Sequence, residues 1–395
     1  MLRDGRSPLD LSQFFCTSYH DDRAAFELAV ADLAERTQRS LQLHRRWLEG
    51  QHDLCVLAAE FPARDPQRLL VLVTGIHGVE GYAGSAIVRY LTQALLASTA
   101  AENTGIVIVH ALNAYGFANG TRVNGDNVDL NRNCAVADEP LFVADSSAYA
   151  ALAPLLSPRG PAQLSRLARA RFYAQLLALR MQHGERSLRE ASVGGQYIDP
   201  DGVFWGGDRV QPEIEFFQEL YERLAGQYRE VLLVDFHTGY GLRGEAYALF
   251  GRADSAAIQA CTDQRVSDAR GRDRTYAVRG DLVGYCYQTA KRSMPLGTCN
   301  GVALEIGTHA LSITAQVADL YTVVLENQTR HYSSRTGSED AQIRADFREL
   351  FYPIATDWRS RTVAIGARCV EGLMRARGFL ATKRASCSNV WRERE

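Results

Sequence analysis

The feature that most constrains the fold is a nearly continuous apolar run from Leu69 to Ile76, which passes almost at once into a helical pattern. Such a run is typical of a strand that is buried on both faces of a sheet, because helices cover both sides. The helix expected after it spans about 83–98. A buried strand joined directly to a helix is half of a β-α-β unit and therefore predicts an α/β protein.

The alternation of strands and helices continues along the chain. Further strands are expected at 106–112, 231–237, 246–250 and 302–306, and further helices at 166–181, 213–228, 315–331, 340–350 and 356–375. Strands separated by helices favour a central sheet that is largely parallel or mixed.

The chain has 395 residues, enough for two domains or for one large domain with insertions. No break in composition marks a linker, so we predict a single elaborated domain over 1–395, with its core at about 65–330. Apolar residues at roughly helical spacing in 21–48 predict a helical N-terminal extension over 1–50. Residues 138–228 differ from the rest of the chain in their residue pattern and are expected to form an insertion. Residues 335–395 are expected to form a helical C-terminal extension.

Composition excludes several classes of protein. Hydrophobic residues make up 46% and charged residues 23%, as in ordinary globular chains, and the net charge is −2. A net charge so close to zero does not indicate binding to nucleic acid or to an anionic membrane. The eight cysteines form no C-x-x-C pair, no 18 apolar residues run together, and the chain start lacks the apolar run of a signal peptide. We therefore expect a reduced, cytoplasmic protein without a nucleic-acid or membrane partner.

Polar residues that follow buried strands are the candidates for a site, because ligands of open α/β sheets bind outside the carboxyl ends of the strands. These residues are His77, Glu80, His237 and Glu305. Two histidines and one glutamate, with water in the fourth position, form the ligand set of many zinc hydrolases. A further carboxylate then acts as the general base.

Each of these signals has a structural alternative. His77 and Glu80 lie among glycines that permit a sharp turn, but a loop histidine and a helix-start glutamate would give the same pattern. Asp235 and His237 share one face of a strand, so Asp235 can hold the second imidazole nitrogen, whereas a solvent-facing histidine needs no such partner. Glu305 near the end of a buried strand would also be explained by an ion pair with an arginine.

The segment 113–133 is rich in Asn, Asp and Arg and poor in apolar residues. It contains Arg122, Asn131 and Arg132. Surface arginines are usually only solvated, but a planar guanidinium beside an asparagine and near a metal site is what a carboxylate-bearing substrate requires.

Five motifs in this order and spacing resemble the zinc carboxypeptidase superfamily: GIHGVEG at 75–81, NAYGFA at 113–118, DLNRN at 129–133, DFHTG at 235–239 and LEIGT at 304–308. That superfamily contains carboxypeptidase A-type exopeptidases and aspartoacylase- and succinylglutamate desuccinylase-type deacylases. The loop GQYIDPDGVFWGG at 195–207 is similar to that of a bacterial carboxypeptidase-like subfamily of mostly undefined substrate. The resemblance covers roughly 65–330 and implies a three-layer α/β/α sandwich with a mixed, largely parallel sheet and added helices.

The resemblance also implies the metal chemistry of the site. One zinc ion per chain would be held by His77, Glu80 and His237. Glu305 matches the general base that takes a proton from water and passes it to the leaving amine, and Arg122 matches the arginine that stabilises the oxyanion.

The substrate-binding residues implied by the resemblance are Asn131 and Arg132, which match the pair that grips a terminal carboxylate. The mobile tyrosine of the family, about twenty residues before the base, has Tyr285 and Tyr287 as candidates, of which we select Tyr285. Two departures are the longer gap between Glu80 and His237 and the presence of Ala114 where the family usually has proline.

Three functions follow as hypotheses. The first is a metallocarboxypeptidase-like enzyme that cleaves an amide bond in a small peptide with a free carboxylate. The second is an N-acyl-amino-acid deacylase with the same chemistry, and the third is a metal- or ligand-binding protein without turnover. Arg132 is required by both hydrolase hypotheses, so it does not separate them. A candidate base beside three metal ligands disfavours the non-catalytic hypothesis.

Overall fold

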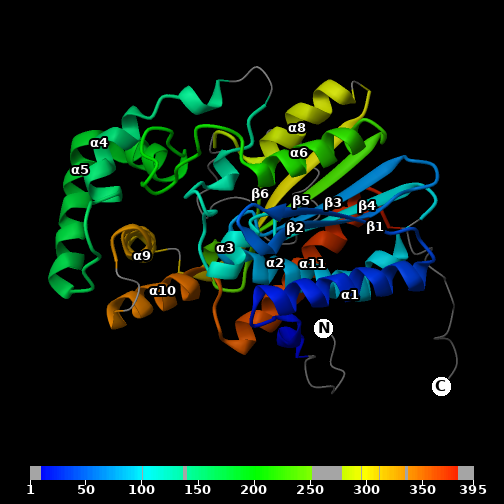
Figure 1. The fold of residues 1–395 in the computed structure, drawn as a ribbon, viewed down its shortest axis with the longest axis horizontal. Helices are drawn as coiled ribbons and strands as arrows, with labels where there is room; N and C mark the ends of the chain where they lie inside the picture. The colour runs from blue at the N-terminus through cyan, green and yellow to red at the C-terminus, as the bar shows by residue number, and fades with distance from the viewer. Residues whose placement is uncertain are drawn as a thin grey trace, which may run out of the picture.

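A mixed sheet runs through the centre of the protein (Figure 1). The structure is a computed structural model that describes residues 10–99, 101–136, 140–250, 278–294, 296–310, 312–333 and 337–380. Within these residues the sheet has seven strands in the order β1-β2-β4-β3-β5-β7-β6. The strands are β1 (Gln42–Leu48), β2 (Gln51–Phe61), β3 (Arg68–Thr74), β4 (Thr104–His110), β5 (Glu230–Leu242), β6 (Ala246–Phe250) and β7 (Thr298–His309).

The four central strands, β4, β3, β5 and β7, are parallel to one another. The pairs toward the two edges are antiparallel: β1 with β2, β2 with β4, and β6 with β7. The prediction of an α/β fold with a mixed sheet and a parallel centre is therefore confirmed. The helices are α1 (Tyr19–Thr37), α2 (Gly81–Ala94), α3 (Ala114–Asn119), α4 (Ser147–Leu156), α5 (Arg166–Val193), α6 (Pro212–Ala225), α8 (Leu282–Ser293), α9 (Ile313–Tyr332), α10 (Ser338–Phe351) and α11 (Thr356–Ala376).

Helices cover both faces of the sheet, which gives the expected three layers (Figure 1). Side chains of β3 alternate between the two faces, as the strand period requires. Leu70 and Leu72 face the core formed with α1, α2 and α11, whereas Leu69, Val71 and Val73 face the core formed with α6 and α8. The apolar run that predicted this strand is thus buried on both sides.

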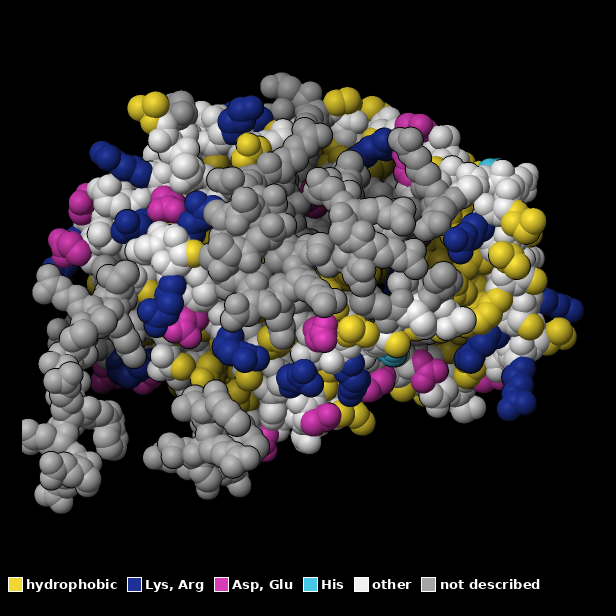
Figure 2. Space-filling model, turned by 180° about the vertical axis from the view of Figure 1, so that it is seen from behind, with side chains coloured by type: hydrophobic (Ala, Val, Ile, Leu, Met, Phe, Trp, Pro, Cys, Tyr) yellow, Lys and Arg dark blue, Asp and Glu magenta, His cyan; other side chains and the backbone are white. Residues whose placement is uncertain are grey.

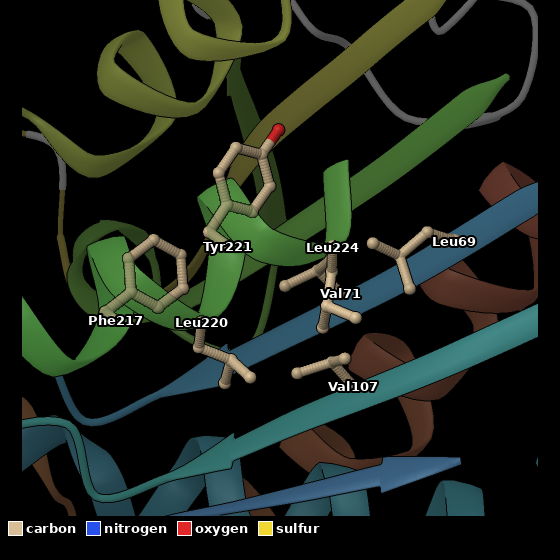
Figure 3. A pocket seen from close by; sticks show the side chains of 7 residues that line it. All are labelled: Leu69, Val71, Val107, Phe217, Leu220, Tyr221 and Leu224. Carbon is tan, nitrogen blue, oxygen red and sulfur yellow. The ribbon is translucent and has the colours of Figure 1, made fainter. Parts of the chain in front are cut away.

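The layer between α6 and the sheet is closely packed. Leu220 and Leu224 of α6 approach Val71 of β3 and Val107 of β4 around a void of about 10 Å³ (Figure 3). A void of this size, lined by apolar side chains, is too small for a ligand. The contact between α6 and these strands is therefore a packing interface.

The insertion at 138–228 divides into two parts. Its first helices, α4 and α5, pack with α9 into separate apolar clusters at one end of the molecule (Figure 1). Its last helix, α6, packs on the sheet instead. The structure therefore places the end of this segment in the core.

The expectation of a helical N-terminal extension to residue 50 is only partly correct. Helix α1 ends at Thr37, and 42–48 forms β1, which pairs with the unpredicted strand β2. Gly50, with a φ of +70°, supplies the backbone conformation of the turn between the two strands. Because β1 is an edge strand whose side chains are half-buried or exposed, its pattern resembles that of an amphipathic helix.

The C-terminal extension is helical in α10 and α11, and 381–395 lies outside the described residues. No helix among the described residues is long and apolar enough to cross a membrane. Basic and acidic side chains are interspersed on the face drawn in Figure 2, in keeping with the small net charge.

The described residues also form short 3₁₀ helices, which are η1 (Leu11–Phe14), η2 (Gly78–Glu80), η3 (Leu96–Ser98), η4 (Leu130–Arg132) and η5 (Leu141–Val143).

Candidate metal centre

The candidate site lies at the carboxyl ends of the parallel strands. His77 follows the end of β3, Glu80 lies in η2, His237 lies in β5 and Glu305 in β7. The register places His237 directly beside Glu305 on the neighbouring strand. The topology therefore brings together four residues that are up to 228 positions apart in the sequence.

Three of these side chains converge closely enough to hold one ion. His77 Nδ1 lies 3.0 Å from Glu80 Oε1, and His237 Nδ1 lies 3.1 Å from Glu80 Oε2. The two Nδ1 atoms are 3.2 Å apart, and one ligand atom from each residue lies within 4.8 Å of the others. All three residues are buried. Two imidazole nitrogens and a carboxylate oxygen are a donor set that suits zinc, with room left for a fourth ligand.

Each histidine contacts a carboxylate through Nε2, the ring nitrogen that points away from the triad. His77 Nε2 lies 3.2 Å from Asp129 Oδ1, and His237 Nε2 lies 2.7 Å from Asp235 Oδ2. A carboxylate on one ring nitrogen fixes the tautomer and orientation that leave the other nitrogen free for a metal. Sequence analysis assigned this role to Asp235 but missed Asp129. The signal available for Asp129 was its position at the head of the DLNRN motif.

Buried charge at the site also favours a cation. Glu80, Asp129 and Asp235 are almost fully buried, and Arg122 is the guanidinium that contacts two of them. Three carboxylates and one guanidinium leave two negative charges, which a dication would neutralise. Burial alone would raise the pKa of Glu80, but the adjacent histidines hold that pKa well below its usual value.

Glu305 is a buried carboxylate with one backbone partner. Its Oε1 accepts a hydrogen bond of 2.8 Å from the N–H of Tyr240, and the residue is 9% exposed. Burial, followed by the negative charge of Glu80, raises the pKa of Glu305 to about 7. A carboxyl group with a pKa near neutrality is suited to accept and return protons at physiological pH.

Arg122 is brought to the centre as the sequence indicated. Its Nε donates to Asp129 Oδ2 at 3.1 Å, and its Nη1 lies 3.3 Å from Glu80 Oε1. Arg122 therefore bridges a proposed metal ligand and the carboxylate that holds His77. This position fixes its guanidinium beside the triad.

Asn131 and Arg132 lie in η4, directly after Asp129. Asn131 Oδ1 accepts a hydrogen bond of 3.0 Å from the N–H of Leu282 at the start of α8. Arg132 Nη1 donates to the carbonyl of Asn131 at 2.6 Å, and Arg132 is 5% exposed. The side-chain oxygen of Asn131 thus positions α8, while Arg132 is buried next to the centre.

Tyr285 is placed away from the triad. Its hydroxyl donates to Glu222 Oε1 at 2.7 Å, and its ring lies against Tyr221 in the interface between α8 and α6. That hydroxyl is therefore committed to the helix interface. A role for Tyr285 or Tyr287 in substrate binding stays a prediction from the resemblance.

A close backbone approach shapes the turn that carries His77 and Glu80. A Cβ on Gly78 would lie 2.1 Å from the carbonyl carbon of Gly116 in α3. Only glycine permits this contact, and Gly75 supplies the positive φ of +70° where the chain leaves β3. The glycines of the first motif are thus explained by packing of η2 against α3.

Comparison with known proteins places the chain in a family. Residues 15–365 match the family model described as "Protein of unknown function (DUF2817)". The chain belongs to this family. No curated protein matches the chain. Since the family has no assigned function, the site itself must indicate one.

Solved structures with a similar fold are distant in sequence. Bovine thrombin-activatable fibrinolysis inhibitor, in complex with tick carboxypeptidase inhibitor, is 12% identical with a TM-score of 0.44; the match covers 91% of this chain and 98% of that one. Carboxypeptidase A from Helicoverpa armigera is 12% identical with a TM-score of 0.42, covering 84% and 73%. Murein-tripeptide amidase from Escherichia coli O157 is 16% identical with a TM-score of 0.33, covering 75% and 95%. These likenesses are too remote to indicate a substrate.

Proposed function

We propose that the protein is a metal-dependent hydrolase that cleaves an amide bond in a small substrate bearing a free carboxylate. The observation that carries the proposal is the triad of His77, Glu80 and His237, whose donor atoms converge next to the buried carboxylate of Glu305. Binding alone would explain the triad but not the neighbouring carboxyl group with its raised pKa.

A zinc ion held by the triad would act as a Lewis acid and make water acidic enough to attack a carbonyl near neutral pH. With the ion bound, Glu305 would take a proton from water and return it to the leaving amine. Its hydrogen bond from the N–H of Tyr240 keeps Oε1 in place and leaves Oε2 for the proton.

Arg122 supports the developing negative charge on the carbonyl oxygen. Its guanidinium is fixed beside the triad by Asp129 and Glu80 and keeps further N–H groups to donate. A donor that is already oriented for an oxyanion contributes a few kcal/mol to the barrier in comparable sites. Arg132, buried beside Asp129, is proposed to bind the free carboxylate of the substrate.

A deacylase of N-acyl amino acids is the second candidate. Its substrate has the same amide and the same free carboxylate, so the same residues would serve it. Both functions require Arg132, so this residue does not distinguish them. They differ instead in the size of the substrate. A binding protein without turnover is disfavoured, because such a protein has no need of Glu305.

Cleavage of a mixed panel tests the proposal. Peptides and N-acyl amino acids, each with a free and an amidated C-terminus, are incubated with and without a chelator and analysed by mass spectrometry. We expect cleavage of free-acid substrates only, abolished by the chelator, and the best substrate then separates peptidase from deacylase. Equal cleavage of both forms would remove Arg132 as the carboxylate clamp, and no cleavage of any substrate would contradict the hydrolase.

A further inference from the structure

Arg132 lies in a cradle built by three glycines from two segments of the chain, the loop 195–206 and the segment before α8 that contains Gly280. A Cβ on Gly195 would lie 2.7 Å from Arg132 Cδ. A Cβ on Gly206 would lie 2.9 Å from the carbonyl oxygen of Arg132, and one on Gly280 would lie 2.5 Å from the same oxygen. Since real Cβ atoms do not approach other atoms so closely, glycine is required at these positions for the observed packing around this one arginine.

Tyr197 closes the cradle. Its hydroxyl donates a hydrogen bond of 2.8 Å to the carbonyl of Arg132. The backbone N–H of Tyr197 donates to Ser146 Oγ at 3.1 Å, and its ring meets Phe142 edge to face. A Cβ on Gly206 would lie 2.2 Å from the Tyr197 ring, so this glycine makes room for tyrosine as well as for arginine.

The loop 195–206 that carries Tyr197 is bound firmly to the segment that carries Arg132. The N–H of Asp129 donates to the carbonyl of Trp205 at 2.8 Å, and Asn133 Nδ2 donates to the carbonyl of Gly206 at 2.7 Å. Gln196 is fully buried, and its side chain bonds four backbone groups of the same loop. The loop is therefore preformed and fixed to the residues on both sides of Arg132.

We propose that the loop 195–206 is a specificity element that positions Arg132 to bind a substrate carboxylate, Tyr197 through the backbone carbonyl of Arg132 and Gly195 through close packing on its side chain. The proposal rests on the proposed function and narrows it to substrates whose carboxylate reaches a buried arginine. A guanidinium fixed in one plane selects a carboxylate over a neutral amide, because only the carboxylate accepts two parallel hydrogen bonds. Neither residue is proposed to touch the reacting atoms.

The first test is Tyr197→Phe, which removes only the hydroxyl on the Arg132 carbonyl. For a free-acid substrate we expect KM to rise about tenfold while kcat stays within about twofold, because binding loses orientation and the chemistry does not. The amidated substrate should stay uncleaved, as with the wild type. The matched control is Tyr321→Phe, whose hydroxyl donates to the carbonyl of Gln163 outside the cradle and whose loss should leave KM unchanged.

A second variant perturbs Arg132 from its side chain instead of its backbone, and circular dichroism checks that both variants are folded. Gly195→Ala places a methyl group against Arg132 Cδ and should raise KM for the free acid in the same selective way. The proposal is overturned if both variants keep the wild-type KM for the free acid, or if kcat falls while KM does not rise. If the wild type itself cleaves nothing in a chelator-sensitive way, the proposed function has failed, and the inference about the loop fails with it.

Discussion

Two carboxylate–histidine pairs face each other at the centre of the site, Asp129 with His77 and Asp235 with His237. Each carboxylate binds Nε2 of its histidine and directs Nδ1 inward, where Glu80 supplies the third donor. The site is thereby arranged for an ion before one binds. Glu305 stands beside this group without being one of its donors, so the proposed roles in metal binding and proton transfer can be tested one at a time.

Glu305→Gln tests proton transfer. An amide cannot take up the proton, so we expect kcat to fall about 10²- to 10⁴-fold, with KM within a few-fold and the zinc content unchanged. Steady-state kinetics and elemental analysis of the same preparation measure these quantities. Glu222→Gln, on α6 beside Tyr285, serves as the control and should retain wild-type turnover. Turnover of Glu305→Gln near the wild-type rate would refute the role of Glu305.

Asp235→Asn tests the outer partner of a ligand. Asparagine no longer holds the His237 ring as a charged acceptor, so zinc affinity should fall about 10- to 100-fold. Competition with a chromophoric chelator measures the change, and Asp201→Asn at an exposed position serves as the control. An unchanged affinity in Asp235→Asn would show that the pair is not functional.

At the residue scale, the structure brings together the side chains that the sequence analysis expected at the ends of buried strands. His77, Glu80, His237 and Glu305 were predicted from strand ends, and Asp235 from strand alternation. Asp129 was missed, because its contact with His77 joins positions 52 residues apart and depends on how the segment 113–133 folds back. The DLNRN motif draws attention to Asp129, but only the folded structure shows its contact with His77.

At the scale of elements, η2 carries Glu80 and packs backbone to backbone against α3. Gly78→Ala would force these elements apart, because its Cβ would lie 2.1 Å from a backbone carbon of Gly116. We expect a loss of about 1–3 kcal/mol in the free energy of unfolding, together with weakened zinc binding. Urea denaturation measures the first and chelator competition the second.

Gly226→Ala provides the matched control for Gly78→Ala. Gly226 has an ordinary helical φ of −66°, and its Cβ would meet no atom closer than 3.8 Å. Its stability should stay within about 0.5 kcal/mol of the wild type. Equal stability losses in the two variants would contradict the packing explanation.

The central strands and the long C-terminal helices were predictable, whereas β1, β2, α4 and α8 were not predicted. Strands β3, β4, β5 and β7 are buried on both faces and stand out as apolar runs, and the long C-terminal helices show helical periodicity. Strand β1 lies at the sheet edge, where half-buried and exposed side chains follow no strict alternation. This segment forms a strand and not a helix because it pairs with β2, and only the tertiary structure specifies that pairing.

At the scale of the whole molecule, helices on both faces bury the sheet, and one buried carboxylate in these layers makes stability depend on pH. Glu213, in the first turn of α6, is 4% exposed, and burial raises its pKa in the folded protein. The folded state therefore holds the Glu213 proton more tightly than the unfolded chain. Its contribution to stability is complete below the unfolded pKa and is lost as pH rises through the folded pKa.

Glu213→Gln should remove this pH dependence. Near pH 4 the variant and the wild type should have similar free energies of unfolding, and at pH 7.5 the variant should be the more stable. The amide keeps an acceptor for Asn124 Nδ2, which lies 3.3 Å from Glu213 Oε1 in the wild type. Urea denaturation at both pH values measures the difference. A variant that is less stable at pH 7.5 would show that the charged form of Glu213 stabilises the fold.

The measurement that tests the central claim most directly is the zinc stoichiometry of the purified protein, compared with that of His237→Ala. After dialysis against metal-free buffer and titration with zinc, elemental analysis should give one tightly bound ion per chain. The His237→Ala protein should retain none, while circular dichroism shows that it is folded. A wild type that binds no stoichiometric zinc, or a folded His237→Ala protein that binds as much as the wild type, would contradict the metal centre and the hydrolase built on it.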